Sequence, residues 1–203
     1  MNTHFVGDSA LLLDMEDAQA AQQLRAAIHR QSLKGLCELV PAYNTLLVEF
    51  DALEFDVTNF IRRLPQFVQA APFPVLAREH DIAVTYNGED LKEVARVTGL
   101  DVVEVIQRHS SATYTVAFLG FAPGFPYLVG LDSKLRVPRL KSPRTNVPAG
   151  AVAVADEFSG IYPQTTPGGW RVLGHTDSIL FDPARASPAL LTPGDKVHFR
   201  PVA

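Results

Sequence analysis

The chain has 203 residues, of which 47% are hydrophobic and 20% charged, the composition of an ordinary globular protein. Its formal net charge of −4 argues against general binding to nucleic acid or to an anionic membrane surface. No apolar run approaches the roughly 18 residues of a membrane span, and the first residues lack the basic start of a signal peptide. One cysteine, Cys37, cannot form an internal disulfide, so we expect a cytoplasmic protein.

The first third of the chain is predicted to alternate between strands and helices. Apolar spacing and turn residues place the strands at residues 4–6, 10–14, 36–40 and 45–50. Helical spacing places the helices at residues 16–30 and about 53–64, and Pro65 is expected to end the second one. The order strand, strand, helix, strand, strand, helix predicts a two-layer β2-α-β2-α domain with both helices on one face of the sheet.

Residues 69–74 contain Ala-Ala-Pro-Phe-Pro and are predicted to be a linker, because the two prolines disfavour helix before them. We therefore expect an N-terminal α+β domain at residues 1–74 and a second domain at residues 75–203. The second domain is predicted to begin with a strand near residues 82–86 and two helices at 89–98 and 101–109. Asp101 and Glu104 have the spacing of a capping box.

The pattern changes after Thr113, where residues 114–119 form a predicted strand and helical spacing does not recur. Eight of the 13 glycines and seven of the 15 prolines lie between Gly120 and Gly174. Short apolar pieces separated by turns follow at residues 151–155, 170–173, 179–181 and 196–199. This pattern is typical of a small β-barrel or sandwich with ordered loops.

The segment Gly120-Phe-Ala-Pro-Gly-Phe-Pro-Tyr-Leu128 is stiffened by its prolines, while its glycines allow tight turns. Its aromatic rings supply flat surfaces. Two interpretations stay open, a turn cluster that covers the barrel and the wall of a small-molecule pocket. The candidate substrate-binding residues in this segment are Phe121, Pro123, Gly124, Phe125 and Tyr127.

A basic run follows, with five cationic residues and no acidic one between positions 134 and 144. It either binds an anion such as a carboxylate or phosphate, or forms a solvated basic loop. Proline neighbours hold the backbone of its arginines and lower the entropy lost on binding. The members of the run are Lys134, Arg136, Arg139, Lys141 and Arg144.

Three further motifs are Ser159-Gly-Ile-Tyr-Pro163, Thr166-Pro-Gly-Gly-Trp170 and Gly174-His-Thr176. Tyr162 and Trp170 are either pocket walls or core aromatics. The chain has no Gly-Lys-Ser/Thr phosphate loop and no Gly-x-Ser-x-Gly nucleophile elbow. Its six histidines are scattered, so no metal site is predicted.

Taken together, these motifs resemble those of one family, that of the 5-oxoprolinase B subunit (PxpB), which includes allophanate hydrolase subunit 1 and the kinase inhibitor KipI. The resemblance extends over essentially the whole chain. It rests on the segment 120–128, on Pro143-Arg144 with Val147-Pro-Ala-Gly150, on Gly160-Ile-Tyr-Pro163 and on Pro167-Gly-Gly-Trp170, with further matches at Gly7-Asp-Ser-Ala-Leu-Leu12 and Val40-Pro-Ala-Tyr43.

The resemblance implies a cyclophilin-like β-barrel after the N-terminal domain, without implying prolyl-isomerase activity. It implies one part of an enzyme that opens 5-oxoproline to glutamate with ATP and Mg²⁺. The other parts would be a homologous barrel protein, the C subunit, which is like allophanate hydrolase subunit 2, together with an A subunit. His109 and Arg144 are then the candidate catalytic residues. Arg136, Arg139, Tyr162 and Trp170 join the candidate substrate-binding residues.

Two alternatives stay open: a regulatory inhibitor of a sensor histidine kinase, and a member of a urea- or allophanate-processing system. Residues 156–159 and His175 depart from the pattern that the resemblance leads us to expect. The local charge is less positive as a result. A different amide is therefore an open alternative for the substrate.

Overall fold

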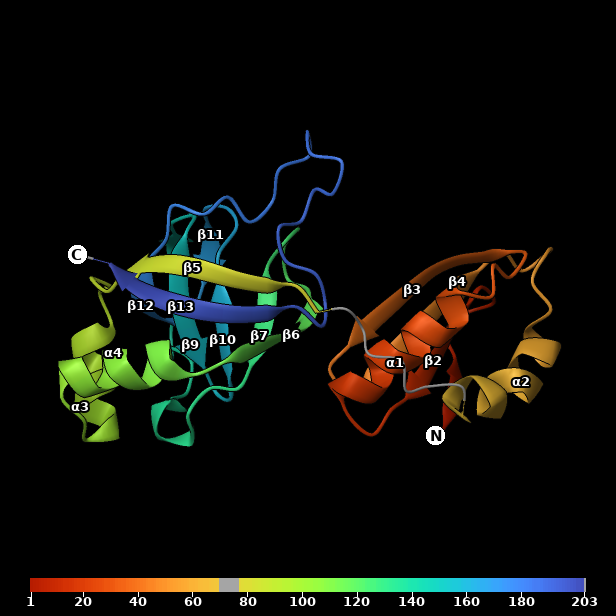
Figure 1. Ribbon diagram of the computed structural model, residues 1–203, viewed down its shortest axis with the longest axis horizontal. Coiled ribbons are helices and arrows are strands. Elements are labelled where there is room, and N and C mark those ends of the chain that lie inside the picture. The colour runs from red at the N-terminus through yellow and green to blue at the C-terminus, as the bar shows by residue number, and fades with distance from the viewer. Residues whose placement is uncertain (70–76, 203) are drawn as a thin grey trace. The chain divides into compact units, whose positions relative to one another are not determined.

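The computed structural model describes residues 1–69 and 77–202 and confirms the α+β class (Figure 1). Contacts divide the chain into two compact units, Met1–Ala77 and Arg78–Ala203. The predicted linker, apart from Gln69, and the predicted boundary after residue 74 lie outside the described residues. Within the described ranges, no helix combines the length and the apolar character needed to cross a membrane.

The first unit is a four-stranded antiparallel sheet in the order β1-β2-β4-β3, together with two helices. Leu11 and Leu13 of β2 lie opposite Val48 and Leu46 of β4 and are fully buried with them. Asp17 caps the first helix by accepting a hydrogen bond from the amide of Ala20. The elements are β1 (Thr3–Phe5), β2 (Ala10–Asp14), α1 (Ala18–His29), β3 (Leu36–Ala42), β4 (Thr45–Phe50) and α2 (Val57–Gln69).

The helix predicted at residues 53–64 is placed wrongly at both ends. Leu53 is 96% exposed, and α2 begins after Asp56, whose side chain accepts a hydrogen bond from the amide of Asn59. Pro65 lies inside the helix rather than after it. Although proline removes one helical hydrogen bond, the helix continues because Phe67 is buried beyond it. Tertiary packing therefore overrides the local signal.

The second unit is built around a closed barrel in the order β10-β7-β6-β13-β5-β12-β9, which confirms the predicted barrel (Figure 1). β13 closes it, pairing parallel to β5 on one side and antiparallel to β6 on the other. The barrel strands are β5 (Glu79–Thr85), β6 (Tyr114–Leu119), β7 (Pro126–Val129), β9 (Ala151–Ala155), β10 (Phe158–Ile161), β12 (Arg171–His175) and β13 (Lys196–Val202).

Two helices, a short 3₁₀ turn and a two-stranded pair complete this unit. They are α3 (Leu91–Thr98), α4 (Val102–Ser111), η1 (Ser133–Leu135) and the antiparallel pair β8 (Arg144–Val147) and β11 (Thr166–Gly168). The strand predicted at residues 179–181 is wrong. Phe181 makes only an isolated bridge to Ala189, and Pro183 and Pro188 lack the amide donors that a longer ladder needs.

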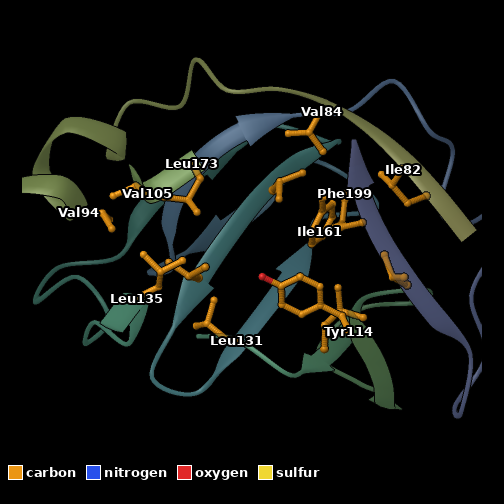
Figure 2. Packing of buried hydrophobic residues seen from close by; sticks show 14 of the residues in the cluster. Ile82, Val84, Val94, Val105, Tyr114, Leu131, Leu135, Ile161, Leu173 and Phe199 are labelled. Carbon is orange, nitrogen blue, oxygen red and sulfur yellow. The ribbon is translucent and has the colours of Figure 1, made fainter. Parts of the chain in front are cut away.

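Apolar side chains fill the barrel, and α3 and α4 lie together at one end of it (Figure 1). Figure 2 shows Val94 and Val105 of these helices on the side that faces the barrel core, with Phe199 and Ile161 further in. Asp101 caps α4 by accepting a hydrogen bond from the amide of Glu104, as predicted.

His109, near the C-terminal end of α4, is fully buried in this core. Its ring stacks on Phe199 at a centroid distance of 4.6 Å. Nδ1 lies 2.8 Å from the hydroxyl of Tyr86, and Nε2 lies 2.9 Å from that of Ser159. Ser159 donates onward to the carbonyl of Ala153. The consistent proton placement has Nε2 donating and Nδ1 accepting.

The environment of His109 keeps its imidazole neutral. Burial lowers the pKa of His109 from 6.5 to about 3, because the charged form would lose its hydration. Proton transfer to a substrate would require access that a fully buried ring does not have. These contacts link α4 to Tyr86 and to Ser159 of β10 inside the barrel. The predicted catalytic role of His109 stays a prediction.

We predict that His109 makes the protein less stable in acid. The unfolded histidine gains a proton as the pH falls below about 6.5, whereas the folded one does not until about pH 3. The contribution of His109 to the free energy of unfolding is therefore full above pH 6.5. It falls by up to about 1.4 kcal/mol for each pH unit below that. Urea unfolding of wild type and His109→Gln between pH 7 and 4 measures this.

The free energy of unfolding of His109→Gln should be lower at pH 7 and should fall less steeply with acid. His198→Gln is the control, because that side chain is 23% exposed and its ion pair is with the exposed Glu79 at 3.8 Å. Equal slopes for wild type and His109→Gln would contradict the account.

Candidate functional site

The motif segments of the second unit come together on the outside of the barrel wall. Phe125, Tyr162 and Trp170 pack with the alanines of β9 as a second apolar core. The ring of Phe125 lies 5.1 Å from that of Tyr162 and 5.3 Å from that of Trp170, edge to face in both cases. All three residues are at most 4% exposed. These three buried rings therefore pack beneath the surface and are not themselves accessible to a ligand.

Phe121 is the exposed member of this aromatic cluster. It is 60% exposed, and its ring meets Phe125 at 5.3 Å and Tyr162 at 6.2 Å. Its φ of 67° is in the left-handed region, which is costly for a residue with a side chain. Such strain is found where the surrounding structure fixes an unusual conformation. Pro123 is exposed beside it, and Gly124 packs against Phe181.

Tyr127 joins the cluster from β7, where its ring stacks on Phe118 at 4.2 Å and meets Trp170 at 5.5 Å. Burial raises the pKa of the neighbouring Tyr162 phenol, and the positive charges of Arg139 and Arg144 act against that rise. Two of the predicted arginines therefore lie within electrostatic reach of the aromatic cluster.

Arg144 makes two ion pairs with protein carboxylates. Its Nη2 lies 2.7 Å from Asp90 and its Nε 2.6 Å from Glu89. Asp90 is buried, and its second oxygen accepts a hydrogen bond from the amide of Val172 at 2.7 Å. Asp90 precedes α3 but does not cap it with its side chain, since both oxygens are used by these partners. We call this set the Asp90 clamp.

The Asp90 clamp joins segments that are far apart in the sequence. Its partners lie at the start of α3, on β8 and on β12. The backbone of Gly88 fits so closely against Val172 and Leu173 that no side chain could be accommodated there. The sequence motifs pointed to Arg144, but nothing in them identified Asp90 or Glu89 as its partners.

Arg139 is more available than Arg144. Its side chain is 58% exposed, its guanidinium carbon lies 5.8 Å from the ring centre of Trp170, and its Nε is 3.8 Å from Asp156. Arg136 is exposed after η1, and no ring contact or ion pair links it to the cluster in the part of the chain that the structure describes. The arginines of the predicted basic run therefore have three environments: Arg144 is in the Asp90 clamp, Arg139 contacts the Trp170 ring, and Arg136 is exposed.

The structure therefore brings most of the predicted substrate-binding residues into one aromatic cluster with Arg139 and Arg144 beside it. His109 is separate, since its side chain points into the barrel core. On the inner face of β10, Ser159 contacts His109, whereas Gly160 faces out toward Phe125 and Trp170. Tyr86 and Ser159, the partners of His109, were not predicted.

Comparison with known proteins identifies the family. The family model for the carboxyltransferase domain, subdomain C and D, matches residues 1–191. The chain is 38% identical to the 5-oxoprolinase B subunit of Escherichia coli in an alignment of 206 positions that covers 98% of this chain and 94% of that protein. The chain belongs to the 5-oxoprolinase B-subunit family. The resemblance inferred from the motifs is confirmed.

Other relatives agree. The 5-oxoprolinase B subunit of Bacillus subtilis is 35% identical in an alignment of 222 positions that covers 96% of this chain and 90% of that protein. The crystal structure of TTHA0988 matches with a TM-score of 0.85 and 40% identity over 96% of this chain, but only 40% of that chain. Urea amidolyase of Saccharomyces cerevisiae is 27% identical in an alignment of 186 positions that covers 86% of this chain and 10% of that protein.

We predict that Asp90→Asn destabilises the protein by about 1–3 kcal/mol, because it leaves the Arg144 guanidinium without its buried charge partner. Glu89→Gln is the matched control, since the Glu89 side chain is 59% exposed and its ion pair is screened by water. It should change the free energy of unfolding by less than about 0.5 kcal/mol. Urea unfolding at neutral pH measures both, and equal effects would contradict the clamp.

Proposed function

We propose that this protein is the B subunit of a cytoplasmic, ATP-dependent 5-oxoprolinase, which opens 5-oxo-L-proline to L-glutamate. One observation carries the proposal: nearly the whole chain is similar to proteins named as 5-oxoprolinase B subunits, at 38% and 35% identity. A protein so named works with companion chains. We propose that the companion chains are a homologous barrel protein, the C subunit, and an A subunit.

The substrate, 5-oxoproline, carries a carboxylate beside its lactam ring, and a guanidinium can bind that group through two parallel hydrogen bonds. Arg139 suits this task because its side chain is exposed and its contact with Asp156 is long. Contact with Trp170 would limit the motion of its side chain, which lowers the entropy lost on binding. Arg144 would first have to leave Glu89 and Asp90.

Phe121 and Pro123 would supply apolar contact for the ring of the substrate. Both are exposed, and Phe121 is supported by buried aromatic neighbours. Phe125, Tyr162 and Trp170 would then act indirectly, by fixing the position of Phe121 and Arg139. Ligand sites often combine an apolar wall with a few placed polar groups.

The proposal includes ATP with Mg²⁺, which would activate the lactam carbonyl toward attack by water. Among residues 1–69 and 77–202, no three His, Cys, Asp or Glu side chains come together as a metal site. We assign this chain no step through the nucleotide.

A second candidate is a role in acting on a urea-derived amide. It is favoured by the similarity to urea amidolyase of Saccharomyces cerevisiae, at 27% identity over 86% of this chain. Asp156, which lies 3.8 Å from Arg139, and its neighbour Glu157 depart from the expected pattern and would suit a substrate with less negative charge. The kinase-inhibitor alternative stays a prediction.

Co-expression with the candidate C and A subunits tests the proposal. The purified assembly should release glutamate from 5-oxo-L-proline only when ATP and Mg²⁺ are present. Parallel assays with urea and allophanate test the second candidate. ATP-dependent release of ammonia from either of these, without glutamate from 5-oxoproline, would replace the first proposal by the second.

In the active assembly, Arg139→Ala should raise KM for 5-oxoproline roughly tenfold or more, since a charge-assisted contact is worth about 1.5–3 kcal/mol. Lys141→Ala removes an exposed cation of the same basic run and serves as the matched control. It should leave KM unchanged. Equal KM values for the two variants would remove Arg139 from substrate binding.

A further inference from the structure

The turn between β9 and β10 is fixed against the basic run. Asp156 and Glu157 form this two-residue turn, and the amide of Asp156 donates to the carbonyl of Val137 at 2.8 Å. Asp156 has a φ of 52°, in the left-handed region that glycine, asparagine and aspartate tolerate best. The turn therefore requires a short residue at this position, but it does not require a charge.

The backbone around Arg139 is held on both sides. The carbonyl of Pro138 accepts a hydrogen bond from Nε of Arg171 at 3.4 Å, and the amide of Leu140 donates to the carbonyl of Gly169 at 2.7 Å. The turn described above is bonded to the same stretch of backbone. The arginine and the aspartate therefore start from fixed positions beside each other.

The two charged groups are close together without a hydrogen bond between them. Nε of Arg139 lies 3.8 Å from Oδ2 of Asp156, which is beyond hydrogen-bond length, and the side chains are 58% and 53% exposed. The guanidinium therefore keeps donors for a ligand, and the carboxylate keeps acceptors. Because the contact is at Nε, the two Nη groups can still bind a carboxylate in parallel.

A guanidinium beside a carboxylate fits a ligand that has an acid group next to a hydrogen-bond donor. The carboxylate of such a ligand binds Arg139, and an N–H on the neighbouring carbon donates to Asp156. An anion without that donor is repelled by Asp156. In 5-oxoproline the ring nitrogen is bonded to the carbon that carries the carboxylate. After ring opening, that nitrogen is the ammonium group of glutamate, which a carboxylate also binds.

We propose that Asp156 determines the specificity of this surface by binding the nitrogen beside the ligand's carboxylate, so that the surface selects α-amino acids and their cyclic amides. This inference rests on the proposed function and uses the same surface as Arg139 and Phe121. Residues 156–159 depart from the expected pattern. A residue in such a place can decide which ligand is preferred without taking part in bond breaking, and we assign Asp156 no catalytic role.

Two matched ligands test the proposal. 5-Oxo-L-proline and its lactone analogue, (S)-5-oxotetrahydrofuran-2-carboxylate, share a ring and a carboxylate, but the lactone has an oxygen in place of the N–H. Calorimetry measures the dissociation constants of both for the full chain, alone and with the companion chains. Wild type should prefer the lactam about fivefold or more, because only the lactam donates a hydrogen bond to the half-exposed carboxylate.

Asp156→Gly keeps the left-handed turn and removes the acceptor, so the two ligands should then bind about equally. Asp156→Asn keeps an acceptor without the charge and should show an intermediate preference. Glu157→Gln removes a charge from the same turn and is the matched control, which should keep the wild-type preference. A defect in folding would weaken both ligands together, whereas the ratio of their dissociation constants reports the contact with the N–H.

An unchanged preference in Asp156→Gly would overturn the inference, as would a wild type that binds the two ligands equally or binds neither. A preference that depends on Asp156, in an assembly that releases no glutamate, would support the inference and overturn the proposed function. Glutamate release by an assembly that shows no preference for the lactam would do the reverse.

Discussion

The buried carboxylate of Asp90 is the interaction on which the candidate site depends. It accepts hydrogen bonds from the guanidinium of Arg144 and from the amide of Val172, and so joins the start of α3 to β8 and β12. Buried carboxylates are tolerated only when their charge and lone pairs are satisfied. Loss of either partner would therefore release the β8–β11 pair, next to which Trp170 and Arg139 lie.

The barrel wall has different chemistry on its two sides. Inside, His109 is held neutral by burial and connects α4 to β10 through Ser159. Outside, the same region of the wall supports Phe125 and Trp170 against Gly160, where no larger residue would fit. A rigid barrel with its polar groups satisfied is a suitable support for loops that must hold an exposed arginine and a strained aromatic ring.

Regular apolar spacing allowed much of the fold to be predicted from the sequence. The strand predicted at residues 10–14 has the observed bounds, and the helix cap at Asp101 was correct, because both depend on neighbouring residues. The end of α2 was missed because the prediction considered only the local effect of Pro65 on the helix. Phe67, beyond that proline, is buried, and its packing favours continuation of the helix. Partners distant in sequence, rather than local propensity, decided that element.

The candidate site was harder to predict for the same reason. The motifs left open whether Tyr162 and Trp170 are pocket walls or core aromatics, and they gave no sign that Phe125 would be buried and Phe121 exposed. The environment of His109 depends on Tyr86 and Ser159, which are 23 and 50 positions away. Arg144 meets Asp90 across 54 positions. One sequence contains no local signal for such pairs.

The central claim is that the Asp90 clamp holds the candidate site together as one unit. A double-mutant cycle with Asp90→Asn, Arg144→Gln and the double variant tests it most directly, through the free energies of unfolding. We expect a coupling energy of about 1 kcal/mol or more, as for residues that share one hydrogen-bond network. Additive effects, within about 0.3 kcal/mol, would contradict the claim, because they would show that the two side chains stabilise the protein independently.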